Sequence, residues 1–180
     1  MSVLVLLISV ALAVYALDQL SKYFVVESLT PGEAVPVLGE LLQFRFVRNS
    51  GAAFSLGAGY TWIFSIVAAA VTVFIVIFAG RIRSLAWATV FGLLLGGTVG
   101  NLTDRLFREP GFGTGHVIDF LQLYAFPAIF NVADIAVVSS MGLFILLTLL
   151  GVGLDGSRHG KAPAQSGPTE SSPAEPGPAA

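Results

Sequence analysis

Hydrophobic residues along the chain fall into four long apolar segments separated by more polar stretches. The segments cover residues 2 to about 26, 61–79, about 85–100 and about 131–152. A helix needs ~20 residues to cross a ~30 Å hydrocarbon core, and each segment approaches or exceeds that length. The pattern predicts an all-α membrane protein with four transmembrane helices. The third helix is short unless it extends past Asn101.

Composition narrows the class of protein further. Of the 180 residues, 55% are hydrophobic and 11% are charged, and the mean hydropathy is +0.84. A soluble domain of this size could not cover its surface with so little charge. The net charge of −2, without a basic run, argues against nucleic-acid binding. The chain has no cysteine and no His-Glu-x-x-His motif, which excludes a thiol nucleophile and a zinc peptidase of that type.

The short connection at residues 81–84 indicates how the chain is oriented. It carries Arg81 and Arg83 and no acid, so the positive-inside rule places it in the cytoplasm. Both termini then lie in the cytoplasm, and the connections at about 27–60 and 104–130 face outward. Residues 1–17 lack the basic region of a signal peptide, so the first segment is predicted to be an uncleaved helix. Five basic residues lie near the outer surface, against the rule: Lys22, Arg45, Arg48, Arg105 and Arg108.

The first outward connection contains a strand pattern. Apolar and polar residues alternate in Leu42-Gln43-Phe44-Arg45-Phe46, and the turn Asn49-Ser50-Gly51 follows. We therefore predict a small extracytoplasmic β-sheet inserted between the first and second helices. Residues 154–180 are rich in Pro, Gly, Ser and Ala, which predicts a disordered cytoplasmic tail after a transmembrane domain of residues 1–153.

The few acidic and amide residues of the apolar segments occur near one end of each segment. Asp119 lies between two segments, and five others lie at or just inside a segment end: Asp18, Asn101, Asp104, Asn131 and Asp134. In the predicted topology all six gather near one membrane surface. Ionisable groups in or beside a membrane span are costly, so such a gathering is a candidate functional site.

Asn131 and Asp134 open the fourth segment three residues apart, and they permit two interpretations. Asn is a good helix N-cap and an acid in the first turn suits the helix dipole, so both could serve the helix alone. Asp119, however, lies among apolar neighbours without a local basic partner. If Asp119 and Asp134 meet at a low-dielectric surface, one keeps its proton. The two would then supply an acid and a base for the attack of water on a peptide bond.

Two further motifs also have structural interpretations. The repeat Gly92-x-x-x-Gly96-x-x-x-Gly100 predicts the close approach of another helix. Arg105, one turn later, either pairs with a carboxylate or binds a substrate carbonyl or a lipid phosphate. Asp18 and Lys22 are four residues apart on a helix, which favours a self-neutralised pair with Lys22 extended toward the interface.

These motifs follow one another in a specific order. The order is Asp18-x-x-Ser21-Lys22, Asn49-x-Gly51-Ala52-Ala53-Phe54, Gly96-Gly97-x-x-Gly100-Asn101-x-x-Asp104-Arg105, Val117-x-Asp119-Phe120 and Phe130-Asn131-x-Ala133-Asp134. In sequence, length and four-span layout the chain closely resembles lipoprotein signal peptidase, also called signal peptidase II. The resemblance extends from about residue 8 to 152.

The resemblance implies an aspartic endopeptidase of the bacterial plasma membrane. Its substrates would be prolipoproteins, cut just before a cysteine that carries diacylglycerol. Asp119 and Asp134 match the catalytic pair. The other matching positions, associated with the substrate pocket or its support, are Asp18, Lys22, Asn49, Gly51, Asn101, Asp104, Arg105 and Asn131. No metal or other cofactor is implied; the expected partners are the lipidated precursors and membrane lipids, and a monomer suffices for the chemistry.

Two other classes of function would also place acids in membrane spans. A small proton- or ion-coupled transporter does so, but here the polar residues collect at one surface and no inverted repeat is visible. A scaffold assembled through the glycine repeat would tolerate Asp119→Asn and Asp134→Asn. A peptidase should lose activity with either substitution.

Overall fold

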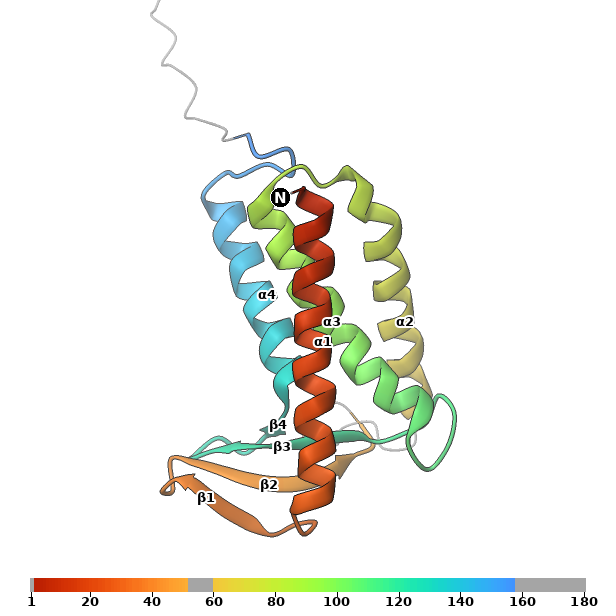
Figure 1. The fold of residues 1–180 in the computed structure, drawn as a ribbon, viewed down its shortest axis with the longest axis vertical. Helices are drawn as coiled ribbons and strands as arrows, with labels where there is room; N and C mark the ends of the chain where they lie inside the picture. Colours follow the sequence, from red (N-terminus) through yellow and green to blue (C-terminus); the bar gives the residue numbers. More distant parts are fainter. Residues whose placement is uncertain (1, 52–59, 158–180) are drawn as a thin grey trace, which may run out of the picture.

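A computed structural model describes residues 2–51 and 60–157, which form four helices with a small sheet at one end (Figure 1). The helices are α1 (Val3–Ser28), α2 (Thr61–Phe78), which continues into the 3-10 turn η2 (Ala79–Arg81), α3 (Leu85–Phe107) and α4 (Val132–Leu149). The strands are β1 (Ala34–Leu38), β2 (Leu42–Asn49), β3 (Val117–Leu123) and β4 (Ile129–Phe130). Of the described helices, these four are long and apolar enough to cross a membrane, which confirms the predicted spans.

The third helix is longer than its apolar segment. α3 continues through Asn101, Asp104 and Arg105 to Phe107, seven residues beyond the predicted end at residue 100. Polar residues usually end an apolar span because they need water. Here their partners come from within the protein, as described below, so the helix continues without a break.

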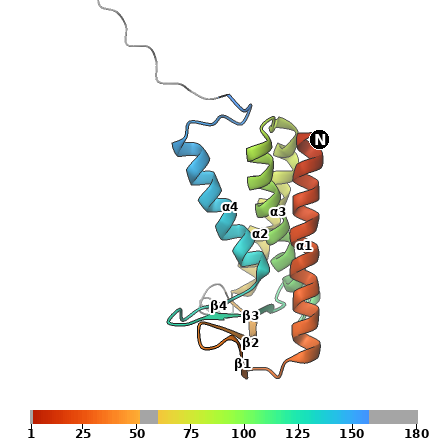
Figure 2. The same ribbon diagram turned by 60° about the vertical axis from the view of Figure 1, so that its left-hand side comes forward.

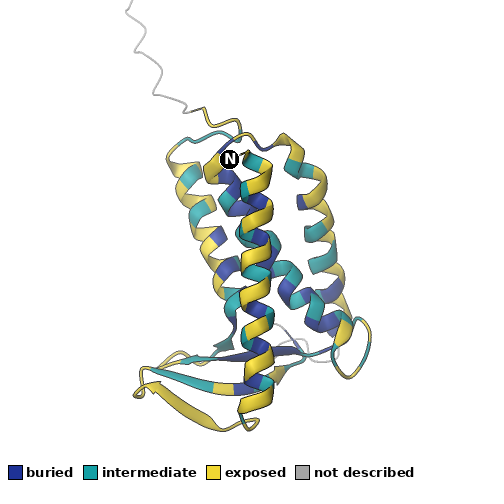
Figure 3. Cartoon of the chain, viewed as in Figure 1, coloured by how far each residue is buried: buried dark blue, intermediate teal, exposed yellow. Residues whose placement is uncertain are grey.

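α3 is the central helix of the bundle. Half of its apolar window is buried, against 22%, 11% and 17% for the spans of α1, α2 and α4. Figure 3 shows the corresponding exposed faces on the outer side of the helices, which suit contact with lipid tails. The glycine repeat explains the close packing: a Cβ on Gly96 would lie 2.6 Å from the Ala11 carbonyl oxygen of α1. A Cβ on Gly97 would likewise lie 2.5 Å from the Ala133 carbonyl oxygen of α4.

The sheet is built from two connections of the chain. Its strands are antiparallel in the order β1-β2-β3-β4, so β1 and β2 from the α1–α2 connection pair with β3 and β4 from the α3–α4 connection. The prediction placed the sheet in the first connection alone and was therefore incomplete. An isolated two-stranded hairpin is marginally stable, and here β3 supplies the buried partner that β2 requires. Val25 of α1 packs with Phe46, Ile118 and Phe120 and fixes the sheet to the helices.

The opposite end of the bundle is closed by the residues that follow α4. The Leu154 carbonyl oxygen accepts hydrogen bonds from the backbone N–H groups of Arg83 and Ser84, at 2.9 and 3.0 Å. The Trp87 indole N–H donates to the Val152 carbonyl oxygen at 2.9 Å. The disordered tail was predicted to begin at residue 154, but residues 154–157 belong to the described part of the chain and Leu154 makes these contacts; for residues 158–180, which lie outside it, the tail stays a prediction. Figure 2 shows that α4 and α1 lie closer together at the sheet end of the bundle than at the opposite end.

Candidate active site

The ten positions singled out in the sequence meet where α1, α3 and α4 approach the sheet. Side chains from these three helices and from β2 and β3 form one hydrogen-bonded network there. The network contains Asp18, Lys22, Asn49, Asn101, Asp104, Asp119, Asn131 and Asp134, and Arg105 joins it through Gly51, which donates to Asn49. The motif residues Ala52, Ala53 and Phe54 lie outside the described residues.

Asp119 lies on β3 and its side chain is almost fully buried, with 4% of the residue exposed. Its Oδ2 accepts a hydrogen bond from Asn49 Nδ2 at 2.8 Å, and its Oδ1 accepts one from Asn131 Nδ2 at 2.7 Å. Burial raises the pKa of Asp119 to about 7, and the charge of Asp134 raises it too, while the two amide hydrogen bonds act in the opposite direction. Asp119 can therefore hold or release a proton near neutral pH.

Asp134 belongs to the first turn of α4 and takes part in a capping box. Asn131 Oδ1 accepts from the Asp134 backbone N–H at 3.0 Å, and Asp134 Oδ2 accepts from the Asn131 backbone N–H at 3.1 Å. The capping interpretation is thus confirmed. It uses only one carboxylate oxygen, however, because Asp134 Oδ1 accepts a hydrogen bond from Asn101 Nδ2 at 2.8 Å. The same side chain caps the helix and faces the network.

Asn131 and Asn101 connect the two aspartates. Asn131 Nδ2 donates both to Asp119 Oδ1 and to Asn101 Oδ1, the latter at 3.1 Å. Asn101 Oδ1 also accepts from Lys22 Nζ at 3.0 Å. Because two donors meet at Asn101 Oδ1, the orientation of its amide is determined, and its N–H must point at Asp134. The two aspartates are thereby held at opposite ends of one amide pair.

A buried ion cluster supports the site from the side of α1. Lys22 Nζ lies 2.7 Å from Asp18 Oδ2 and 2.8 Å from Asp104 Oδ2, and none of the three side chains is exposed. Asp18 Oδ1 accepts from the Ala133 backbone N–H at 3.0 Å, which joins α1 to the start of α4. The prediction that Lys22 extends toward the interface was wrong. With the Asn101 oxygen as a third acceptor, all three ammonium hydrogens are satisfied inside the protein.

Two members of the cluster were missed by the sequence reasoning. Arg108 Nε donates to Asp104 Oδ1 at 2.7 Å, and the four-residue spacing of this pair on a helix was a signal that could have revealed it. Gln19 Nε2 donates to Asp18 Oδ2 at 3.0 Å and to the Gly100 carbonyl oxygen at 3.1 Å. Nothing in the local sequence distinguishes Gln19 from an ordinary interfacial glutamine.

Arg105 is buried beside the aspartates but pairs with neither. Its Nη2 donates to the Gly51 carbonyl oxygen at 2.7 Å, and its guanidinium lies 5.3 Å from the centre of the Phe64 ring. Gly51 N–H in turn donates to Asn49 Oδ1 at 3.0 Å. Among the described residues, Arg105 Nη1 is the only buried side-chain nitrogen or oxygen without a hydrogen-bond partner. A buried donor without a partner is costly and therefore available to a ligand.

A cavity of about 610 Å³ opens onto these groups. Its polar lining comes from Ser139 of α4 and from six site residues, namely Asn49, Gly51, Asn101, Arg105, Asp119 and Asp134. The rest of the wall is mainly apolar and includes Phe126, Ile129 and Phe130 beside the sheet and Ile135 and Val138 on α4. Among the described residues, no three or more His, Cys, Asp or Glu side chains are grouped to hold a metal ion. The cavity can thus accept an apolar ligand and present a small set of polar groups to one part of it.

Comparison with known proteins gives consistent results. A model of the signal peptidase II family matches residues 10–150. A lipoprotein signal peptidase of Leifsonia xyli subsp. xyli is 64% identical over 156 residues, covering 87% of this chain and 72% of the relative. One of Mycobacterium avium is 46% identical over 150 residues, covering 83% and 82%. A bacterial membrane enzyme solved at 2.3 Å superimposes with a TM-score of 0.71 at 29% identity, covering 79% of this chain and 87% of that structure.

The fold and the site together define a multi-pass membrane protein whose polar centre lies at one end of its helices, inside a largely apolar cavity. Such a centre suits chemistry on a substrate that is itself held in the membrane. The chain belongs to the signal peptidase II family and is thus a membrane protease of lipoprotein processing.

Proposed function

We propose that the protein is an aspartic endopeptidase that removes the signal peptide from diacylglyceryl-modified prolipoproteins, cutting just before the lipidated cysteine. The observation that carries the proposal is the placement of Asp119 and Asp134. Both carboxyl groups line one cavity, and Asn131 contacts both of them. Each comes from a different element, so their approach is a property of the fold and not of one helix cap.

The charges of the site favour one proton on the aspartate pair. Four carboxyl groups and three cationic side chains make up the ionisable groups of the network and its immediate contacts: Asp18, Asp104, Asp119 and Asp134 with Lys22, Arg105 and Arg108. A single bound proton therefore makes the group neutral. Because burial raises the pKa of Asp119 to about 7, we assign the resting proton to Asp119 and the negative charge to Asp134.

This protonation state supplies an acid and a base on either side of a peptide bond. Asp134 accepts a proton from a water molecule, and the water oxygen attacks the carbonyl carbon before the cysteine. Asp119 donates its proton to the carbonyl oxygen and so neutralises the tetrahedral intermediate. When the C–N bond breaks, a proton passes from the pair to the leaving amine of the cysteine. The products are the free signal peptide and a new N-terminal cysteine.

Other features of the cavity suit a lipidated peptide. Its apolar wall matches acyl chains and the apolar residues of a signal peptide. Diacylglycerol attached to cysteine has carbonyl groups but no phosphate, so we assign Arg105 Nη1 to a carbonyl oxygen of the substrate. Gly51 and Phe64 hold the guanidinium in place before the substrate arrives. A single chain provides all of these groups, so a monomer is sufficient.

The topology of the chain supports a site near the outer membrane surface. Arg81 and Arg83 lie in the η2 turn and the following connection, at the end of the bundle opposite the sheet (Figure 1). The positive-inside rule assigns that end to the cytoplasm, with both termini. The sheet and the aspartates then lie at the outer surface, where a precursor with its lipid in the bilayer can enter laterally.

Cleavage of a diacylglyceryl-modified prolipoprotein by the purified protein tests the proposal. We expect wild type to cut before the lipidated cysteine, and Asp119→Asn and Asp134→Asn each to fold without cutting. Glu109→Gln is the matched control, because Glu109 also lies near the end of α3 but is exposed and, among the described residues, ion-paired only with Arg48, at 3.0 Å. It should retain full activity.

The pH dependence of cleavage tests the proton assignment. Because Asp119 must hold its proton, kcat/KM should fall as the pH rises through about 7. An inactive wild type, or full activity in either aspartate variant, would reject the peptidase assignment. Gradient-driven uptake by that inactive protein would then favour a transporter, and full stability without activity would favour a scaffold.

A further inference from the structure

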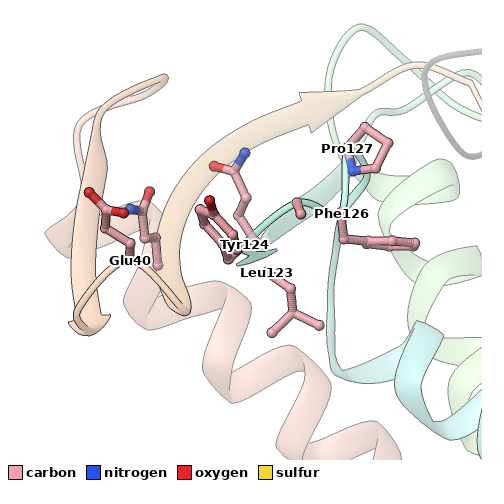
Figure 4. A pocket seen from close by; sticks show the side chains of 8 residues that line it. Glu40, Leu123, Tyr124, Phe126 and Pro127 are labelled. Atoms are coloured by element: carbon pink, nitrogen blue, oxygen red, sulfur yellow. The ribbon is translucent and has the colours of Figure 1, made fainter.

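A second cavity lies on the sheet, beyond the sheet-side ends of α3 and α4. Its volume is about 370 Å³, and it lies between the β1–β2 turn and the connection from β3 to β4 (Figure 4). Glu40, Gln43, Gln122 and Tyr124 provide its polar lining. We refer to it as the outer cleft. None of the groups assigned to catalysis above lines it.

The walls of the outer cleft suit a peptide backbone. Gln43 of β2 and Gln122 of β3 are direct cross-strand partners, so their side chains project from the same face of the sheet. In the described part of the structure neither side-chain amide makes a hydrogen bond, although both are half-buried. An amide side chain offers a donor and an acceptor, which is the complement of a peptide group. Two such side chains next to each other can hold an extended segment.

The outer cleft and the active-site cavity share two residues. Leu123, the last residue of β3, and Phe126 in the connection to β4 line both spaces. They form an apolar rim between a cavity that contains the aspartates and a cleft that contains amides and a carboxylate. A chain with its scissile bond at the aspartates would cross this rim to enter the cleft.

The polarity of the two spaces indicates which part of a substrate each one takes. A signal peptide is apolar and stays in the bilayer beside the helices, whereas the mature lipoprotein must continue into water. The outer cleft is more polar than the active-site cavity and lies on the sheet, beyond the sheet-side ends of α3 and α4 (Figure 1). It therefore lies on the side toward which the mature chain must leave.

We infer that the outer cleft binds the first residues of the mature lipoprotein, directly after the lipidated cysteine, as an extended peptide. This inference rests on the proposed function. Gln43 and Gln122 bind the backbone, which makes the cleft tolerant of many sequences. Glu40, an exposed carboxylate without an ion-pair partner in the described chain, disfavours acidic side chains in this segment and favours basic ones.

The test compares two lipidated precursors that differ only in the residues two to four after the start of the mature chain, with lysines in one and glutamates in the other. For wild type we expect a kcat/KM about two- to fivefold higher for the lysine precursor at low salt, since exposed charge pairs contribute little more. Glu40→Gln should remove the preference and Glu40→Lys should reverse it. Glu33→Lys, the same change at an exposed residue just before β1 that does not line the cleft, should leave the preference as in wild type.

The glutamines are tested with a third substrate that ends at the lipidated cysteine. Gln43→Leu with Gln122→Leu should raise KM for the full precursors several-fold and leave kcat unchanged, and it should not affect the truncated substrate. Equal charge preference in wild type and Glu40→Lys, or an equal effect on full and truncated substrates, would overturn the inference while leaving the peptidase assignment intact. Failure of wild type to cut any of the three substrates would instead reject the proposed function.

Discussion

The buried Asp119 carboxyl should make the stability of the protein depend on pH between about 4 and 7. Its ordinary pKa is 3.8 and burial raises the pKa to about 7 in the folded protein. Between these two values the unfolded chain releases the proton while the folded protein keeps it, so stability falls as the pH rises and becomes constant above about pH 7. The interval of about three pH units, at about 1.4 kcal/mol each, corresponds to ~4 kcal/mol.

Asp119→Asn removes this titration. We expect the difference in unfolding free energy between the variant and wild type to move in favour of the variant by up to ~4 kcal/mol from pH 4 to pH 8. The variant has its own constant cost, because its amide N–H group meets the donors Asn49 and Asn131, but that cost does not depend on pH. The prediction therefore concerns how the difference in unfolding free energy changes with pH, and not its value at any one pH.

Thermal unfolding in detergent at a series of pH values measures this change. For a chain of this size, 1 kcal/mol corresponds to about 2–4 °C in Tm, so the relative shift should be on the order of ten degrees. Glu109→Gln is the control, because it removes a carboxylate that is exposed to solvent and not buried. A constant Tm difference between Asp119→Asn and wild type across the whole range would refute the raised pKa and, with it, the assignment of the proton to Asp119.

Further expected outcomes concern the ion cluster, the helix packing and the arginine. Lys22→Met should destabilise the protein by ~3–5 kcal/mol in a denaturant or thermal titration, because it leaves the buried Asp18 carboxylate without a cation and Asp104 with Arg108 alone; unchanged stability would contradict this. Gly96→Ala should cost ~1–3 kcal/mol against the backbone of α1, whereas Gly142→Ala, with nothing within 4 Å of its Cβ, should be neutral. Arg105→Lys should lower kcat/KM for lipidated precursor without changing Tm by more than a few degrees, and normal kinetics would refute its substrate contact.

The apolar pattern predicted the helices well because hydrocarbon solvation is a local property of each segment. Length and hydropathy identified all four spans, and the glycine spacing predicted the close approach of another helix, which the structure shows to be α1. Strand β2 was also predicted from its alternation. Strand β3 was not, because Val117 to Phe120 are all buried and show no alternation. A strand buried on both faces is recognised only with its partners.

The sequence identified the residues of the site but not the contacts between them. The predicted topology placed Asp119 and Asp134 near one membrane surface and left their meeting as a condition, and their link through Asn131 depends on the approach of β3 to α4. The position of Arg105 was left open, and its contact with Gly51 crosses 54 positions of sequence. Lys22 was assigned to the interface because a single helix offers only Asp18 as its partner. Tertiary structure adds Asp104 and Asn101.

The ion cluster has a consequence for the order in which the membrane protein assembles. During synthesis α1 enters the bilayer before α3 and α4 exist, and at that stage Lys22 has only Asp18 for a partner. As an isolated helix it can keep both charges at the water interface. They become buried when α3 brings Asp104, and the cluster closes when the N–H of Ala133, in the last span to insert, reaches Asp18. The proposed catalytic centre therefore forms only after α4 is in place, so we expect a chain that lacks α4 to have no peptidase activity.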